Sequence, residues 1–148
     1  MKKLIISMLI AASVMSCGGT PKNVSEFKGK DWKLVEVWVD NKNIDFNRKD
    51  LANQKAGDIF TIKFDAEKLS GTGAPNRYSA PYTIDGNSIK AMPMVATQMA
   101  SIWRPEKLRE YDYFQFLQNL SEWALNNGKL ELTSKTDDGR AVKLVYSL

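Results

Sequence analysis

The chain has 148 residues, a net charge of +4 and 26% charged residues, a composition typical of one globular domain with its own core. It has no histidine and one cysteine, which excludes Ser-His-Asp and Cys-His catalytic pairs, histidine-bearing zinc sites and an intrachain disulfide. Its lysines and arginines are spread along the sequence rather than gathered in a stripe, so we expect no nucleic-acid partner.

The N-terminus is typical of an export signal. Lys2 and Lys3 precede an apolar run, residues 4–14, that is too short to span a bilayer as a stable helix. Val14-Met15-Ser16-Cys17 then resembles a bacterial lipobox, in which the cysteine is lipidated and the peptide before it is removed. The alternatives are an ordinary signal peptide with an incidental cysteine, or a single membrane helix.

The lipobox predicts three parts: a signal peptide over 1–16, lipidated Cys17 with a flexible tether over 17–30, and a domain over 31–148. Each buried methylene of a palmitate-type acyl chain adds about 0.8 kcal/mol, so several chains anchor the protein durably to a membrane. Gly18 and Gly19 give no inner-membrane aspartate signal of the enteric type. We therefore expect a lipid-anchored protein of the bacterial cell envelope, on the outer membrane and facing the periplasm.

The first half of the domain reads as strands. Residues 32–39 are β-branched and aromatic on both faces, which predicts a central strand with Trp32 and Trp38 in the core. The polar residues 41–58 predict no regular element, and Asp85-Gly86-Asn87 predicts a tight hairpin turn. Alternating or β-rich patterns predict further strands over 60–64, from Leu69 to Gly73, around Tyr82 and Ile84, and over 88–92.

One segment has helical periodicity. Arg104-Pro105-Glu106 predicts its start, with proline near the first position and an acid in the first turn. Its apolar face is spaced i, i+3, i+4 and i+7, at Tyr113, Phe116, Leu117 and Leu120. About three strands follow, and the turn Asp137-Asp138-Gly139 separates the last two. These elements predict an α+β fold, a curved antiparallel sheet closed by one helix.

The segment GTGAPNRY, residues 71–78, is glycine-rich and raises the question of phosphate binding. A phosphate loop needs a following helix N-terminus, and the Walker type needs Lys-Ser/Thr after the glycines. Neither follows here. We therefore interpret the segment as a bend between strands, in which Gly71 and Gly73 let the backbone turn and Pro75 fixes φ.

Over residues 30–148 the order of these segments resembles a META domain, the family of HslJ-like envelope proteins. The resemblance rests on WKLVEV, FTIKFD, GTGAPNRYSAPYTIDGNSIK, ATQMAS, FLQNL, and GKLELTS followed by AVKLV. Of the family's G-x-x-G-C-N-x-Y motif, this chain keeps Gly73, Asn76, Arg77 and Tyr78, and of its T-x-M-x-C motif it keeps Thr97 and Met99.

Two departures from the family pattern matter. The motif cysteines of many members fall here at Pro75 and Ser101, so no disulfide or redox function of that pair carries over. Residues 102–113 form a longer stretch before the helix than is usual. The resemblance otherwise implies a small cracked β-barrel with one packed helix, similar to type III secretion pilot lipoproteins, which can hold a lipid tail. Members are associated with heat shock, motility and antibiotic tolerance, without established catalysis.

The motif residues Gly73, Asn76, Tyr78, Thr97 and Met99 have two interpretations. They either line a ligand site or satisfy backbone groups and fill the core, and the second is the commoner use of such residues. Asp137 and Asp138 look like a carboxylate pair but fall in a turn, which favours solvated residues over a catalytic dyad. The helix is richer in aromatic residues than a one-sided core helix needs, which leaves a partner or lipid contact open.

We therefore expect a non-catalytic cell-envelope lipoprotein with a protein-interaction or stress-tolerance role. The alternative is a module that binds a lipid or another apolar small ligand inside the barrel. An enzyme is disfavoured, because the chain has no histidine and no thiol besides Cys17. We expect no cofactor and no metal. The expected partners are the membrane, through the N-terminal lipid, and an envelope protein or an apolar ligand.

Overall fold

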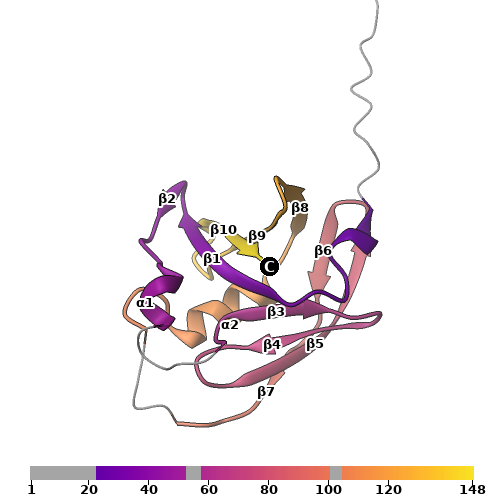
Figure 1. The fold of residues 1–148 in the computed structure, drawn as a ribbon. Coiled ribbons are helices and arrows are strands. Elements are labelled where there is room, and N and C mark those ends of the chain that lie inside the picture. The colour runs from indigo at the N-terminus through magenta and orange to yellow at the C-terminus, as the bar shows by residue number, and fades with distance from the viewer. Residues whose placement is uncertain (1–22, 53–57, 101–104) are drawn as a thin grey trace, which may run out of the picture.

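The computed structural model describes residues 23–52, 58–100 and 105–148, and in it the chain closes into a β-barrel (Figure 1). Within these residues, eight strands form an antiparallel ring, and the last pairs back with the first. In ring order the strands are β1 (Trp32–Val39), β3 (Thr61–Phe64), β4 (Lys68–Thr72), β5 (Arg77–Asp85), β6 (Ser88–Ala91), β8 (Glu122–Asn126), β9 (Lys129–Lys135) and β10 (Ala141–Ser147). The α+β barrel that the sequence predicted is confirmed.

Short elements are attached to this ring. Two strands pair from outside it, β2 (Lys42–Asn43) with β1 and β7 (Val95–Ala96) with β5. The helices are a 3-10 turn η1 (Val24–Glu26), α1 (Arg48–Ala52) and α2 (Glu110–Gln118). Among the described residues, no helix is long and apolar enough to cross a membrane.

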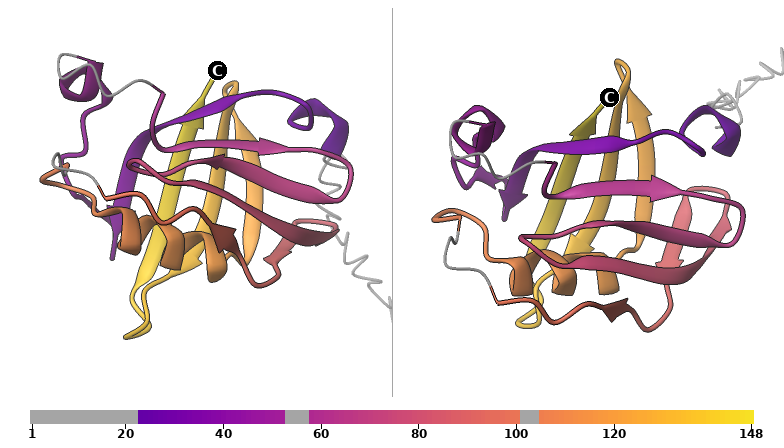
Figure 2. Two further views of the ribbon diagram at one scale, coloured as in Figure 1. Left: turned by 90° about the horizontal axis from the view of Figure 1, so that it is seen from below. Right: turned by 60° about the horizontal axis from the view of Figure 1, so that its bottom comes forward.

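The ring is closed unequally. β1 and β10 pair along most of their length, from Lys33 opposite Ser147 to Val39 opposite Val142. β6 and β8 are in register at a single position, Ser88 opposite Glu122, with two further backbone hydrogen bonds beside it. α2 contacts both β6 and β9, and Figure 2 shows it lying across this side of the barrel. The helix therefore covers the side on which the sheet is thinly joined, as expected for a cracked barrel.

Aromatic side chains fill the barrel. They come from the strands, from α2 and from the segments just after η1 and just before β3. The largest fully buried ones are Trp32, Trp123, Tyr113, Tyr146, Phe27, Phe60 and Phe64. β3 directs Ile62 and Phe64 inward, and Phe60, just before it, is buried as well, as the alternating sequence pattern predicted. Trp38 is different. It is only half-buried, Lys143 lies over its ring and its indole N–H donates to Glu36, so the prediction that it belongs to the core is wrong.

Three other predictions need correction. The helix was expected to begin at 104–106, but residues 105–109 are not helical and α2 begins at Glu110, after an extended Arg109. Leu120 lies beyond its end, although it is buried like Tyr113, Phe116 and Leu117. Residues 41–58 contain β2 and α1, and β7 was not foreseen. Elements of two to five residues are too short to show a period.

Candidate functional site

The motif segment 71–78 forms the hairpin between β4 and β5. Thr72 pairs with Arg77, and the four residues between them make the turn, with a cis peptide between Ala74 and Pro75. The Gly73 N–H donates to the Asn76 carbonyl at 2.6 Å, and the Gly73 carbonyl accepts from the Phe60 N–H at 3.1 Å. A strand rather than a helix follows, so the structure agrees with the bend and gives no phosphate loop.

Asn76 is the centre of a hydrogen-bonded cluster. Its side chain is buried, and its Oδ1 accepts from the Met99 N–H at 2.6 Å and from the Thr97 hydroxyl at 2.8 Å. Its Nδ2 donates to the Met99 carbonyl at 3.3 Å and to Glu110 Oε2 at 2.7 Å. The amide therefore pairs with Met99 as a peptide group of a neighbouring strand would, which holds residues 97–99 against the hairpin.

Glu110, the first residue of α2, completes the cluster. Its Oε1 accepts from the backbone N–H groups of Ala74 at 2.5 Å and Asn76 at 2.6 Å, while Oε2 takes the Asn76 side chain. Hydrogen bonds to a charged acceptor are stronger than neutral ones. We call Asn76, Thr97, Met99 and Glu110 the Asn76–Glu110 cluster. Glu110 was not among the predicted site residues, because the sequence placed the helix start at 104–106 and Glu110 then falls inside the expected helix.

Gly73 allows this close approach. A Cβ atom at position 73 would lie 2.6 Å from Glu110 Oε1 and 2.8 Å from the Phe114 ring. Real side chains do not come so near, so any larger residue would displace α2 or rotate Glu110 away from the turn. The glycine in the motif is thus explained by the helix that packs on it.

Tyr78 points away from this cluster and into the barrel. Its hydroxyl donates to the Thr61 carbonyl at 2.7 Å and lies 3.2 Å from the hydroxyl of Tyr113, which in turn accepts from Tyr146 at 3.2 Å. Burial raises the pKa of Tyr113 to about 12 and the pKa values of Tyr78 and Tyr146 well above 10. This tyrosine cluster (Tyr78, Tyr113 and Tyr146) is therefore neutral at physiological pH.

A half-buried arginine supports the same side of the barrel. Arg48 of α1 donates to the carbonyls of Leu34 at 2.7 Å, Ile59 at 2.5 Å and Phe60 at 3.0 Å. Burial lowers the pKa of this guanidinium from its usual value. Three carbonyl partners compensate for the loss of water, so Arg48 acts as a structural clamp between the beginning of β1 and the residues just before β3.

The structure thus brings together four of the five motif residues, Gly73, Asn76, Thr97 and Met99, and separates Tyr78 from them. Among the described residues, every buried side-chain nitrogen and oxygen has a hydrogen-bond partner. None is left free to bind a ligand, which favours the structural interpretation of the motif. Cys17 and Ser101 lie outside the described residues, and Pro75 lies in the hairpin turn.

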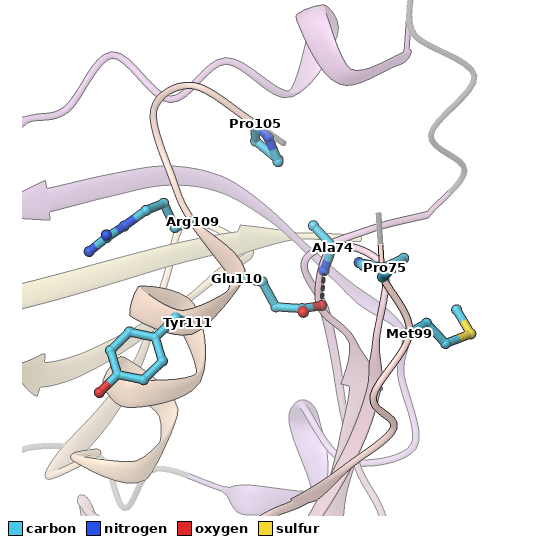
Figure 3. A pocket seen from close by; sticks show the side chains of 8 residues that line it. Ala74, Pro75, Met99, Pro105, Arg109, Glu110 and Tyr111 are labelled. Atoms are coloured by element: carbon cyan, nitrogen blue, oxygen red, sulfur yellow. Dashed lines mark hydrogen bonds between the residues drawn. The ribbon is translucent and has the colours of Figure 1, made fainter. Parts of the chain in front are cut away.

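Two surface hollows lie next to the Asn76–Glu110 cluster. The first, of about 390 Å³, is bordered by the hairpin turn, Met99 and the start of α2. In Figure 3 the Glu110 side chain is turned toward the Ala74 amide, while the side chains of Arg109 and Tyr111 extend away from it. The second, of about 480 Å³, combines the apolar residues Val39, Ile44, Leu108 and Phe116 with charged residues of α2 and of the β9–β10 turn. Arg109 and Tyr111 border both hollows.

The Asp137–Asp138 pair lies on the surface, as the sequence pattern of a turn favoured. Asp137 and Asp138 are exposed in the β9–β10 turn, and Arg140 lies 3.0 Å from Asp138. Hydrogen bonds from Thr136 and Arg140 hold the pKa of Asp138 below its usual range. Within the described residues, no three acidic or cysteine side chains gather in a geometry that could hold a metal ion.

Solved structures share this fold. An NMR structure of a protein from Burkholderia xenovorans is 18% identical and matches with a TM-score of 0.59, over 99% of both chains. A crystal structure of a DUF4847 family protein from Bacteroides vulgatus is 14% identical, with a TM-score of 0.55, over 82% of this chain and 93% of that one. No curated protein matches the sequence significantly. The family model of the META domain matches residues 25–146, and the chain therefore belongs to the META domain family.

Proposed function

We propose that this META domain is a non-catalytic binding module of the bacterial cell envelope, held at the membrane by a lipid on Cys17, and that it binds another envelope protein. The observation that carries the proposal is the placing of exposed apolar side chains. The described residues leave five large ones exposed: Met92 (40%), Val95 (70%), Met99 (57%), Tyr111 (63%) and Leu148 (64%). Four of the five lie on residues 92–99 or at the start of α2.

Hydrogen bonds hold part of the region that carries these four side chains in place. We call residues 92–100 the strap, and all of it except Met94 is exposed. The Asn76–Glu110 cluster fixes residues 97–99 of the strap to the hairpin and to α2, so Met99 and Tyr111 are held around one hollow. Exposed apolar groups that are already ordered bind a partner with little further loss of conformational entropy.

The filled barrel supports a protein partner over a ligand inside the barrel. Trp32, Trp123, Tyr113 and Tyr146 occupy the interior and are at most 2% exposed. A lipid or another apolar ligand would have to displace these side chains. Native mass spectrometry checks this alternative: a reproducible adduct that is lost on unfolding would favour the ligand-binding module.

Site-specific photo-crosslinking tests the protein-binding proposal. A benzophenone amino acid replaces Tyr111 in the full-length protein, produced in its own host, and replaces exposed Asn127 in the β8–β9 turn as the control. We expect one defined crosslinked product from position 111, none from position 127, and loss of the product when Met99→Ser is added. Equal products from both positions, or none from position 111, would contradict the proposal.

The lipid tether is tested separately. Cys17→Ser removes the only thiol of the chain, and with it the site of acylation. We expect the parent protein in the membrane fraction and Cys17→Ser in the soluble fraction or as unprocessed precursor. Parent protein that is recovered soluble would refute the lipoprotein assignment, while the crosslinking result at Tyr111 would stand on its own.

A further inference from the structure

The strap continues β6 along the same edge of β5. β6 pairs with the end of β5, where Tyr82 lies opposite Ala91, and β7 pairs with its beginning, where Ser79 lies opposite Val95. The register shifts between these two pairings, and the irregular link contains Pro93. β7 is therefore the resumption of one long strand after a bulge.

One edge of the strap is fully engaged. The Thr97 N–H donates to the Arg77 carbonyl at 3.0 Å, and the Met99 N–H donates to Asn76 Oδ1 at 2.6 Å. The backbone of Thr97 and Met99 thus faces β5 and its turn. In an extended chain successive residues direct their backbone groups to opposite edges, so Ala96 and Gln98 direct theirs away from β5.

The opposite edge has no strand beside it. In the described part of the chain, β7 pairs with β5 alone. The Tyr78–Ala96 position alternates with the hydrogen-bonded Arg77–Thr97 position, and Gln98 lies beyond β7 with no backbone hydrogen bond to another described residue. Both residues are exposed. Figure 1 shows β7 at the lower rim of the molecule, whereas the corresponding edge of β6 meets β8 at Ser88.

Natural proteins protect such edges with lysine, proline or a bulge. Lys90, Pro93 and the bulge protect the upstream end of this edge. Beyond Pro93 the protection ends, since no residue from 91 to 103 is charged. The free backbone groups of Ala96 and Gln98 lie in this uncharged stretch, so the strap offers a short, neutral and ordered strand edge.

We propose that the free edge of β7 receives an extended, uncharged segment of the partner protein as an added β-strand. This inference rests on the proposed function and specifies how the partner binds. The free edge spans about five residues, or about 17 Å. Pairing with a second copy along so short an edge falls well below the roughly 800 Å² per partner of a stable dimer, whereas a peptide strand binds through its main-chain hydrogen bonds.

A synthetic probe tests the strand addition directly. The probe is fluorescein-labelled Val-Thr-Val-Thr-Val-Thr-amide, titrated by anisotropy against the full-length lipoprotein in nanodiscs, with empty nanodiscs as the blank. We expect saturable binding, weakened about tenfold or more when alternate peptide nitrogens of the probe are methylated, because main-chain donors are lost while the side chains remain. Undiminished binding of the methylated probe, or no binding of the parent probe at millimolar concentration, overturns the proposal.

Two variants at one position give the matched control. Ala96→Pro removes the outward N–H, whereas Ala96→Ser keeps it, so the probe should bind the serine variant normally and the proline variant about tenfold or more weakly. A dimer that forms with rising protein concentration and competes with the probe would assign the edge to a second copy instead. If Tyr111 crosslinks persist in Ala96→Pro, the strand addition is wrong but the protein-binding proposal stands. If the benzophenone amino acid at position 111 gives no crosslinks in the protein without the Ala96 substitution, the protein-binding proposal itself fails.

Discussion

Asn76 and Tyr78 are two residues apart at the start of β5, yet they belong to different hydrogen-bonded clusters. The Asn76–Glu110 cluster lies near the surface, uses a charged acceptor and pins an exposed strap. The tyrosine cluster lies inside the barrel, uses neutral hydroxyls and joins α2 to β3, β5 and β10. Two neighbouring residues of one short motif therefore have different roles: Asn76 holds an exposed segment in place, and Tyr78 helps to fix the core.

Substitution of the two motif glycines, Gly71 and Gly73, should have the largest effects on stability. A Cβ on Gly71 would clash with the Thr61 carbonyl, a backbone atom, so we expect Gly71→Ala to lower the free energy of unfolding by about 3 kcal/mol or more. A Cβ on Gly73 meets side chains that can rotate, so Gly73→Ala should cost about 1–2 kcal/mol. Urea denaturation measures both, and equal losses would contradict the distinction.

The next effect concerns the charged acceptor. Glu110→Ala leaves the backbone N–H groups of Ala74 and Asn76 and the Asn76 side chain without their carboxylate, and we expect a loss of about 2–3 kcal/mol. Exposed Glu106 is the matched control, and Glu106→Ala should cost less than about 0.5 kcal/mol. Similar urea midpoints for the two variants would show that Glu110 does not hold the strap.

Alkaline pH should destabilise the protein through the tyrosine cluster. Its three pKa values are raised in the folded chain, so above about pH 10 the unfolded chain releases protons that the folded chain still holds. Stability is therefore fully present below pH 10 and falls as the pH rises through 10 toward 12. Urea midpoints at pH 8, 10 and 11 measure this slope. Tyr113→Phe should cost about 1 kcal/mol at pH 8 and make the slope shallower, and an unchanged slope would contradict the assignment.

The smallest expected effect lies on the strap itself. Val95 is 70% exposed, so Val95→Ser should change the free energy of unfolding by less than about 0.5 kcal/mol. Crosslinking from Tyr111 should nevertheless weaken if Val95 contacts the partner. A large loss of stability without any change in crosslinking would mean that the strap packs as part of the core.

The sequence predicted the elements with a clear period. Phe60, Ile62 and Phe64 alternate, and the spacing of Tyr113, Phe116 and Leu117 gave the buried face of α2. Closure of the sheet into a barrel followed only from the resemblance to META domains. The pinned strap could not be foreseen, because Asn76 and Glu110 are far apart in sequence and a side chain that replaces a peptide group leaves no periodic pattern.

The pairing of β1 with β10, which closes the barrel, affects how fast the chain can fold. It joins Lys33 to Ser147 and Val39 to Val142, so the strands that close the ring come from opposite ends of the domain. Contacts this distant in sequence slow folding, because a long loop must close before any of them forms. Until residues 141–147 have been synthesised, β1 has no partner along that edge. A chain that is still incomplete therefore exposes an apolar strand edge, and the barrel can close only after residues 141–147 have been made.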